Sequence, residues 1–284
     1  MADQQNSPAE AEPRKISVKC LSSDYDGTIS PLNISRTDSR VPLQTRVLLR
    51  QISRFLPISI ITMKDLSFII PRTPFANAWS ALGGLEIRIG KRVLKREPLE
   101  HRLTSISKAF DYAKSHIKEP RVEIEEKQDS EGRTIAFCVD WRMAKDSKTA
   151  KQEIEKVAAY CQALGLLLIR YETQPFYDVY PVAPDKGWAL QEMLNGLTVE
   201  RGVLYLGDSQ TDNSAFKSSN ISVGVIHEET PVNALDCDYL VRFEDVPDFL
   251  NMLIANKLIF SSDFPMLKIN HNKMKKPRAE KRAS

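Results

Sequence analysis

The sequence lacks a long hydrophobic run. No segment approaches the roughly 18 consecutive apolar residues of a membrane-spanning helix. The N-terminal residues, MADQQNSPAEAEPRK, also lack the apolar stretch of a secretory signal. We therefore expect a cytoplasmic protein without membrane contact. Its 42% hydrophobic and 27% charged residues are typical of a globular protein with a buried core.

Cysteine is scarce, and its spacing argues against two kinds of site. The chain has four cysteines, and no two of them are close in sequence: Cys20, Cys138, Cys161 and Cys237. Without paired spacing, neither a disulfide framework nor a cysteine zinc site is expected. We interpret the four residues as reduced thiols.

The net positive charge of the chain, +3, comes from its C-terminal segment. Residues 268–284 hold seven Lys and Arg residues and one Glu, so this segment carries +6 and the remainder −3. A basic segment of this kind is typical of weak binding to nucleic acid, but it has no aromatic residue for stacking on bases. We therefore favour a disordered tail over 268–284, with a second one over 1–14, and expect no nucleic-acid partner.

Short apolar strands alternate with helical segments in two parts of the chain. Strands are predicted over residues 16–23, 57–62, 202–209, 221–225 and 238–242. The first and third of these end in acidic residues, and a helix is predicted over 42–55. Strands that alternate with helices predict a parallel α/β sheet.

The middle of the chain has a different pattern. Helices are predicted over 99–118 and 145–164, and strands over 121–127, 133–142, 166–172 and 176–181. The residues QDSEGR between the first two strands are typical of a hairpin turn. Paired strands with helices indicate an α+β domain. We expect this domain, called the cap below, to span 90–181 and to be inserted into a core formed by 15–89 and 182–262.

Acidic side chains follow two of the predicted core strands. Asp24 and Asp26 follow the first strand, and Asp208 ends the strand over 202–209. Ligands of open parallel sheets bind at the carboxyl ends of the strands, where these carboxylates would repel one another unless a cation held them. Oxygen ligands favour Mg²⁺, and a carboxylate can act as a nucleophile toward phosphorus. Gly27 permits a tight turn that exposes backbone amides to an anion, and Thr28 adds a further donor.

Four sequence motifs now carry a resemblance. DYDGT (24–28) resembles the first motif of the haloacid dehalogenase superfamily of phosphotransferases. Thr62 matches the second motif, Lys186 in PDKG the third, and GDSQTD (207–212) the fourth. Their order and their span of nearly the whole chain imply a Rossmann-like parallel-sheet core with an inserted α+β cap. YLGDSQTDNSAF and YDVYPVAPDKGWAL are most similar to the trehalose-6-phosphate phosphatases and related sugar-phosphate phosphatases.

The resemblance implies a role for each matching core residue. Asp24 would be the nucleophile, and Asp26 the general acid and base. Mg²⁺ would be held by Asp24, the backbone carbonyl of Asp26 and Asp208. Thr62 and Lys186 would bind the phosphoryl oxygens, with Gly27 and Thr28 as further substrate contacts. Asp212 would orient Lys186 or a metal-bound water.

The cap carries the expected sugar contacts. Glu125 and Lys127 match an E-x-K element of the family, Arg142 its arginine after the next strand, and Asp178 lies where the family has a glutamate. Other positions depart from the family. Thr62 is followed by Met-Lys-Asp where Gly-Arg is usual. In Gly83-Gly84 the usual His or Asn before the second glycine is missing, and Asp140-Trp141 replaces His-Tyr. These departures leave the identity of the sugar open.

Several alternatives remain at this stage. The leading prediction is Mg²⁺-dependent hydrolysis of trehalose 6-phosphate. Other substrates are a glycosyl-phosphoglycerate, sucrose phosphate or a hexose phosphate, and phosphomutase activity or a non-catalytic accessory subunit would use the same pocket. Individually, Asp24 and Asp26 could form an ordinary Asp-Gly turn, and Glu125, Lys127 and Arg142 a solvated hairpin face. The sequence leaves open whether the protein is a monomer or a homodimer.

Overall fold

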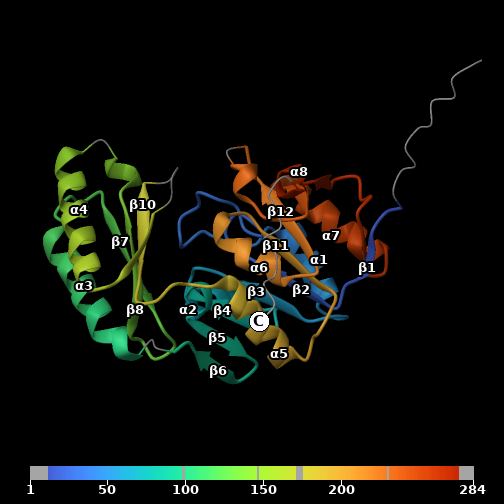
Figure 1. Ribbon diagram of the computed structural model, residues 1–284, viewed down its shortest axis with the longest axis horizontal. Coiled ribbons are helices and arrows are strands. Elements are labelled where there is room, and N and C mark those ends of the chain that lie inside the picture. The colour runs from blue at the N-terminus through green and yellow to red at the C-terminus, as the bar shows by residue number, and fades with distance from the viewer. Residues whose placement is uncertain (1–11, 98–99, 146, 171–174, 229, 275–284) are drawn as a thin grey trace, which may run out of the picture.

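A computed structural model describes residues 12–97, 100–145, 147–170, 175–228 and 230–274. It divides into a core and a cap that lie side by side (Figure 1). The core contains a nine-stranded sheet in the order β15-β13-β12-β11-β2-β3-β4-β5-β6. Its parallel strands are β2 (Cys20–Ser23), β3 (Ile58–Ile61), β4 (Ala78–Ala81), β11 (Val203–Gly207), β12 (Ile221–Ile226) and β13 (Tyr239–Arg242). Antiparallel strands β5 (Glu86–Ile89), β6 (Arg92–Lys95) and β15 (Lys268–Ile269) extend its edges.

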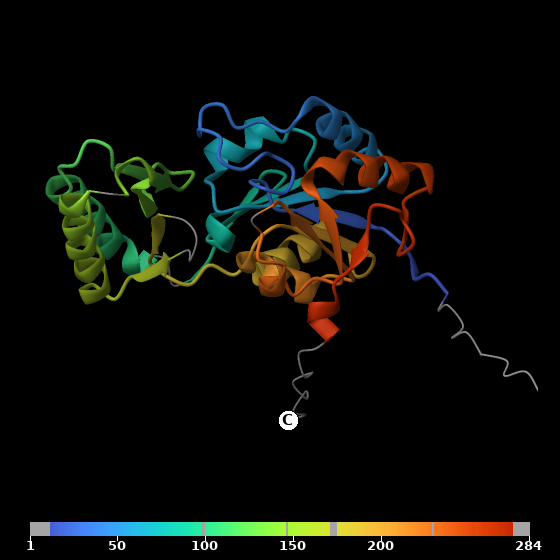
Figure 2. The same ribbon diagram turned by 90° about the horizontal axis from the view of Figure 1, so that it is seen from above.

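Helices cover both faces of this sheet, as Figure 2 shows. One face carries α1 (Leu43–Ile52), α2 (Leu66–Arg72) and α7 (Val246–Ala255), and the other α5 (Lys186–Leu197) and α6 (Asn213–Ser218). Successive strand residues point to opposite faces, so Leu204 and Leu206 join one hydrophobic cluster, and Val203 and Tyr205 another. Burial on both faces explains why these strands are almost continuously apolar. The mixed architecture with a mostly parallel sheet is the predicted α/β fold.

The C-terminal segment corrects one expectation. Residues 268–274, predicted as part of a disordered tail, form β15 and the short helix α8 (His271–Met274). Asn270 is buried and donates to the carbonyl of Leu235, and the Lys273 ammonium lies 2.6 Å from a carboxylate oxygen of Asp238. The prediction from net charge missed this ordered segment, because counting charges does not reveal that Lys273 has Asp238 as a partner. The rest of that tail, 275–284, and residues 1–11 lie outside the described residues.

Two segments from opposite ends of the core also pair with each other. Strand β1 (Lys15–Ser17) pairs with β14 (Ile259–Ser261) in a separate antiparallel sheet.

All four cysteines are buried free thiols, as predicted. In the part of the chain that the structure describes, no helix is both long and apolar enough to cross a membrane.

The cap is an antiparallel sheet backed by two helices. Its strand order is β7-β8-β10-β9, formed by β7 (Glu123–Gln128), β8 (Thr134–Asp140), β9 (Leu167–Arg170) and β10 (Phe176–Tyr180). Helices α3 (Leu103–His116) and α4 (Lys148–Ala163) lie on the side away from the core (Figure 1). The predicted start of the cap at residue 90 is too early, because β6 pairs with β5 and continues the core sheet.

The strand register decides which cap residues face the core. Glu125 and Asp178 both pair with Cys138, so these three side chains share one sheet face. The alternate residues, among them Phe137 and Val139, pack into the hydrophobic cluster with α3 and α4. The face with the two acids is therefore turned toward the core.

Candidate active site

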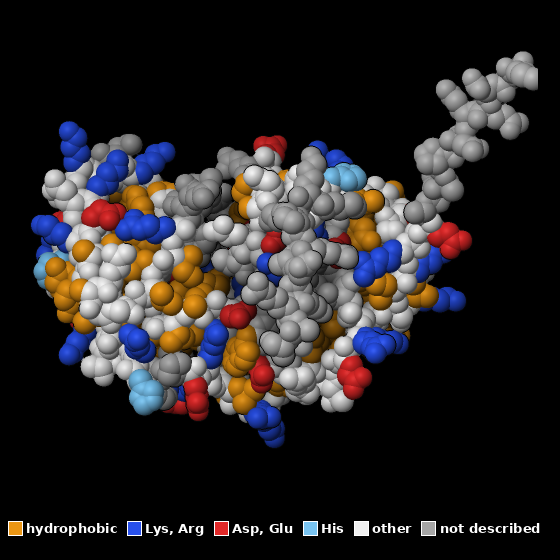
Figure 3. Space-filling model, viewed as in Figure 1, with side chains coloured by type: hydrophobic (Ala, Val, Ile, Leu, Met, Phe, Trp, Pro, Cys, Tyr) orange, Lys and Arg blue, Asp and Glu red, His pale blue; other side chains and the backbone are white. Residues whose placement is uncertain are grey.

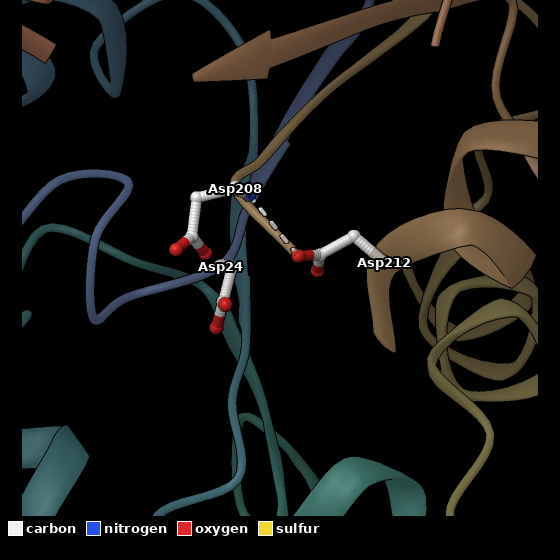
Figure 4. Close-up of side chains that lie close together, drawn as sticks. All are labelled: Asp24, Asp208 and Asp212. Atoms are coloured by element: carbon white, nitrogen blue, oxygen red, sulfur yellow. Dashed lines mark hydrogen bonds between the residues drawn. The ribbon is translucent and has the colours of Figure 1, made fainter. Parts of the chain in front are cut away.

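Two acids predicted from separate parts of the chain lie next to each other. Strands β2 and β11 are parallel neighbours with Ser23 opposite Leu206, so the residues that follow them, Asp24 and Asp208, emerge at the same edge. The Asp24 amide donates to the Leu206 carbonyl at 2.9 Å. Carboxylate oxygens of Asp24, Asp208 and Asp212 all lie within 4.8 Å of one another (Figure 4).

Lys186 connects two of these acids. It is the first residue of α5, and Asp185 caps the helix by accepting from the Gly187 and Trp188 amides. The Lys186 Nζ lies 2.9 Å from Asp24 Oδ2 and 2.7 Å from Asp212 Oδ1. Burial alone would lower the pKa of Lys186, but the charges of Asp212 and Asp24 outweigh it and raise the pKa. The side chain is therefore a buried, fully charged ammonium.

Asp212 is saturated with donors. Its Oδ1 accepts from Lys186 and from the Tyr205 hydroxyl at 2.7 Å, and its Oδ2 from the amides of Asp208 and Ser209 at 3.1 and 3.0 Å. Figure 4 shows the Asp208 contact as a dashed line. With both oxygens engaged, Asp212 is an anchor for Lys186 and for the loop that carries Asp208. Tyr205 was missed by the sequence analysis, because a buried strand tyrosine gives no signal of its hydroxyl's partner.

The charges of the cluster are incompletely balanced. Burial raises the pKa of Asp24 to about 7, with Lys186 opposing the shift and Asp212 adding to it. Burial and the charges of Asp24 and Asp212 raise the pKa of Asp208 well above its ordinary value. Buried carboxylates that repel one another in this way bind a divalent cation favourably, and an all-oxygen donor set fits Mg²⁺. The residues present therefore fit the predicted metal.

The loop after β2 is shaped around Asp208. Gly27 has φ +76°, and a β-carbon at this position would lie 2.2 Å from Asp208 Oδ2. The buried Thr28 hydroxyl donates to Asp208 Oδ1 at 3.3 Å, so in this structure it contacts the acid. The Gly27 carbonyl lies 2.7 Å from Nε2 of His227. Sequence reasoning gave His227 no role, because its partner is a backbone atom distant in the sequence.

Asp26 lies on the side of the site nearer the cap. Its side chain is 37% exposed, and its Oδ2 lies 4.0 Å from the Lys64 ammonium. Burial raises the pKa of Asp26, Lys64 opposes this shift and Glu125 of the cap adds to it. Its carboxylate is separate from the three acids that converge, which leaves it free to handle a proton.

Thr62 follows the end of β3 and is almost fully buried. Its amide donates to the Ser80 carbonyl, and its hydroxyl oxygen accepts from the Lys64 amide at 3.2 Å. These contacts fix the turn that brings Lys64 toward Asp26.

The four predicted sugar-binding residues of the cap occupy three different environments. Lys127 and Asp178 form a buried ion pair at 2.5 Å, and Lys127 also donates to the Tyr180 hydroxyl at 3.3 Å. Glu125 reaches the core, where it pairs with Arg36. Arg142 is 46% exposed and pairs with Asp140 within the cap, so the structure does not bring it to the acidic cluster.

A cavity of about 380 Å³ lies between the cap and the core. Its cap wall is apolar, and its core wall includes Lys186: the lining residues are Met63, Leu167, Leu168, Ile169, Ala183, Pro184, Lys186, Gln210, Thr211 and Ser214. On the face shown in Figure 3, hydrophobic side chains gather where the cap adjoins the core. The interface between the two domains thus offers space for a small molecule beside the Lys186 side chain.

Comparison with known proteins supports the fold. No family model matches the chain. Among solved structures, a trehalose-6-phosphate phosphatase related protein superposes with a TM-score of 0.66 at 16% identity, covering 84% of this chain and 100% of that one. The C-terminal domain of trehalose-6-phosphate phosphatase from C. albicans gives 0.65 at 18% identity, covering 84% and 93%. A haloacid dehalogenase-like hydrolase from Bacteroides thetaiotaomicron gives 0.62 at 16%, covering 83% and 99%. The chain therefore shares the fold of this superfamily.

Proposed function

We propose that the protein is a Mg²⁺-dependent phosphatase that hydrolyses a sugar phosphate monoester, with trehalose 6-phosphate as the leading candidate. The observation that carries this proposal is the buried Lys186 ammonium between Asp24 and Asp212, with Asp208 beside them at the carboxyl ends of parallel strands. The fold shared with trehalose-6-phosphate phosphatase supports the substrate class.

In the first half of the reaction, the Asp24 carboxylate attacks phosphorus and the bond between phosphorus and the sugar oxygen breaks. Lys186, 2.9 Å from Asp24, favours the ionised nucleophile and binds a phosphoryl oxygen together with Thr62. Asp26 enters protonated, which its raised pKa favours, and gives its proton to the leaving sugar oxygen. The products of this half are an aspartyl-phosphate on Asp24 and the free sugar.

In the second half, Asp26 is a carboxylate and accepts a proton from water. The water oxygen attacks phosphorus, and the bond to Asp24 breaks. Inorganic phosphate leaves, Asp24 is again a carboxylate, and Asp26 is again protonated. Atoms and charges therefore return to their starting arrangement.

Asp24, Asp208 and the backbone carbonyl of Asp26 would hold Mg²⁺. Asp212 keeps its predicted supporting role, because each of its oxygens already accepts at least two hydrogen bonds. When bound, the metal supplies positive charge that offsets the repulsion between the carboxylate and the phosphate dianion.

The cap would exclude bulk water and contact the sugar. Glu125 contacts the core on the Asp26 side of the site, and Lys127 and Asp178 lie on the same sheet. Gly27 shapes the loop and Thr28 orients Asp208, and both would also contact the substrate, as the sequence predicts. The substrate is a small, soluble sugar phosphate, which is compatible with a cytoplasmic enzyme.

A panel of phosphorylated sugars tests this proposal. The panel contains trehalose 6-phosphate, sucrose phosphate, a glycosyl-phosphoglycerate and hexose phosphates, each assayed with Mg²⁺ and with EDTA. We expect the highest kcat/KM for trehalose 6-phosphate and no turnover with EDTA. Met-Lys follows Thr62 where Gly-Arg is usual, so another sugar phosphate of the panel is the second candidate substrate. Failure to hydrolyse any ester with Mg²⁺ would indicate a non-catalytic binding protein.

A further inference from the structure

Lys64 holds an unusual position between the core and the cap. Its ammonium lies 4.0 Å from Asp26 Oδ2 and 3.9 Å from Glu125 Oε2. Charge-assisted hydrogen bonds are about 2.7–2.9 Å long, so neither contact is one. Among the described residues this ammonium has no hydrogen-bond partner, and the side chain is 23% exposed. The ammonium also lies 5.7 Å from the centre of the Phe68 ring, a contact that leaves its N–H donors able to reach a ligand.

The neighbouring Glu125 does not depend on Lys64 to stay in place. Its Oε1 pairs with the Arg36 guanidinium, which also pairs with Asp65. Asp65 is itself fixed as the N-cap of α2 by accepting from the Phe68 amide at 2.8 Å. The Arg36 guanidinium lies 4.7 Å from the centre of the Phe68 ring. The cap carboxylate is thus held by the core, and the Lys64 ammonium lies beside it as an open donor.

The charges of this region indicate what would fill the gap. A hydroxyl oxygen between the two groups can accept from the Lys64 ammonium while its proton is donated to Glu125. An anionic group in the same place would be opposed by both Glu125 and Asp26. A neutral hydroxyl satisfies both residues, whereas a carboxylate satisfies one.

We propose that Lys64 is a specificity-determining residue that binds, together with Glu125, a hydroxyl group of the leaving sugar on the Asp26 side of the site. This inference rests on the proposed function and narrows its substrate to esters of a neutral polyhydroxyl compound. Lys64 contacts the leaving group, not the phosphoryl group, so its effect depends on which hydroxyls the substrate carries.

The test combines changes in the enzyme with changes in the substrate, in the manner of a double-mutant cycle. The substrates are glucose 6-phosphate, which is the phosphorylated ring of trehalose 6-phosphate, and its 2-, 3- and 4-deoxy forms. The variants are Lys64→Met and Lys64→Arg. The matched control is Lys95→Met, because Lys95 is a core lysine with similar exposure, 20%, that pairs with cap residue Asp129 at 3.1 Å outside the acidic cluster.

In the native protein, loss of one of the three hydroxyls should lower kcat/KM roughly 10- to 100-fold, the range for a hydrogen bond to a charged group. In Lys64→Met the same deoxygenation should change kcat/KM less than about 3-fold, since the partner is already gone. Lys64→Arg should restore part of the difference, and Lys95→Met should keep the native ratio. An equal loss for all four substrates in Lys64→Met would overturn the assignment.

Binding separates this inference from the proposed function. Dissociation constants of the same four esters are measured by calorimetry for Asp24→Asn and for Asp24→Asn/Lys64→Met. If the native protein hydrolyses neither these esters nor any member of the sugar-phosphate panel, but Lys64→Met weakens binding of every ester except one deoxy form, the phosphatase proposal fails and the Lys64 assignment holds. If the esters are hydrolysed, but Lys64→Met changes kcat/KM and the dissociation constants equally for all four, the Lys64 assignment alone is wrong.

Discussion

Gly27 and Asp208 lie against each other in the fold, although they are 181 positions apart in the sequence. A β-carbon on Gly27 would lie 2.2 Å from Asp208 Oδ2, well inside van der Waals contact. The loop after β2 and the acid after β11 therefore fit together only without a side chain at residue 27.

Replacing Gly27 with Ala tests this contact. Alanine at φ +76° costs about 1–2 kcal/mol of strain, and its methyl group would also displace the Asp208 carboxylate. We expect kcat/KM to fall at least ~100-fold, because a misplacement of about 1 Å has effects of that size. Gly132→Ala is the matched control, since Gly132 has φ +77° and nothing within 4 Å of the added carbon. Equal activity of the two variants would contradict the argument.

Metal removal should make stability depend on pH. The folded-state pKa of Asp24, about 7, lies above its ordinary value near 4, so the metal-free folded state binds the proton more tightly than the unfolded chain. The stability of the metal-free protein should therefore fall as pH rises from about 4 to about 7. Mg²⁺ at about 100 times its dissociation constant should raise Tm by roughly 5–10 °C at pH 8, and by less at pH 5.

Thermal scans between pH 5 and pH 8, with EDTA or with Mg²⁺, measure this effect. Asp24→Asn should flatten the decline in the metal-free protein and reduce the Mg²⁺ shift. A metal-free Tm that rises over this range, or a Mg²⁺ shift that is the same at every pH, would refute the raised pKa of Asp24 as the cause.

Lys127 forms a buried ion pair with Asp178 in the cap and does not belong to a solvated hairpin face, the alternative that the sequence left open for it. Both side chains are at most 5% exposed and their charged atoms lie 2.5 Å apart. Burial alone would lower the pKa of Lys127, but the charge of Asp178 raises it well above its ordinary value. Lys127→Met should cost about 3–5 kcal/mol of unfolding free energy, since it leaves a buried charge without its partner.

Chemical denaturation provides the measurement, with Lys108→Met on the exposed side of α3 as control. The double variant Lys127→Met/Asp178→Leu should recover most of the loss. A cost below about 1 kcal/mol for Lys127→Met would mean that the pair behaves as an exposed one.

Much of this arrangement could be predicted from the sequence. Apolar strands that end in acids indicated the positions of Asp24 and Asp208, because parallel strands end at the same edge of a sheet. The match of PDKG to the third motif indicated Lys186, and the structure places its ammonium against Asp24 and Asp212.

Other features depend on contacts that no local pattern reveals. Arg36, in the loop before α1, holds Glu125 of the cap, and His227 contacts the backbone of Gly27. Both pairings join segments far apart in sequence. Arg142 was placed with the sugar-binding residues by its match to the family's arginine after a strand, and in the structure it pairs with its neighbour Asp140. A motif fixes the order of residues, whereas the partner of a charged side chain is decided by tertiary packing.

Trapping of the covalent intermediate tests the central claim, that Asp24 is the nucleophile. In Asp26→Asn, p-nitrophenyl phosphate can still phosphorylate Asp24, because its leaving group needs no proton, while hydrolysis of the intermediate lacks its base. After acid quench and peptide mass spectrometry, we expect the phosphoryl group on Asp24, approaching about one per chain, and none in Asp24→Asn/Asp26→Asn. A phosphoryl group on another residue, or turnover retained by Asp24→Asn, would contradict the account.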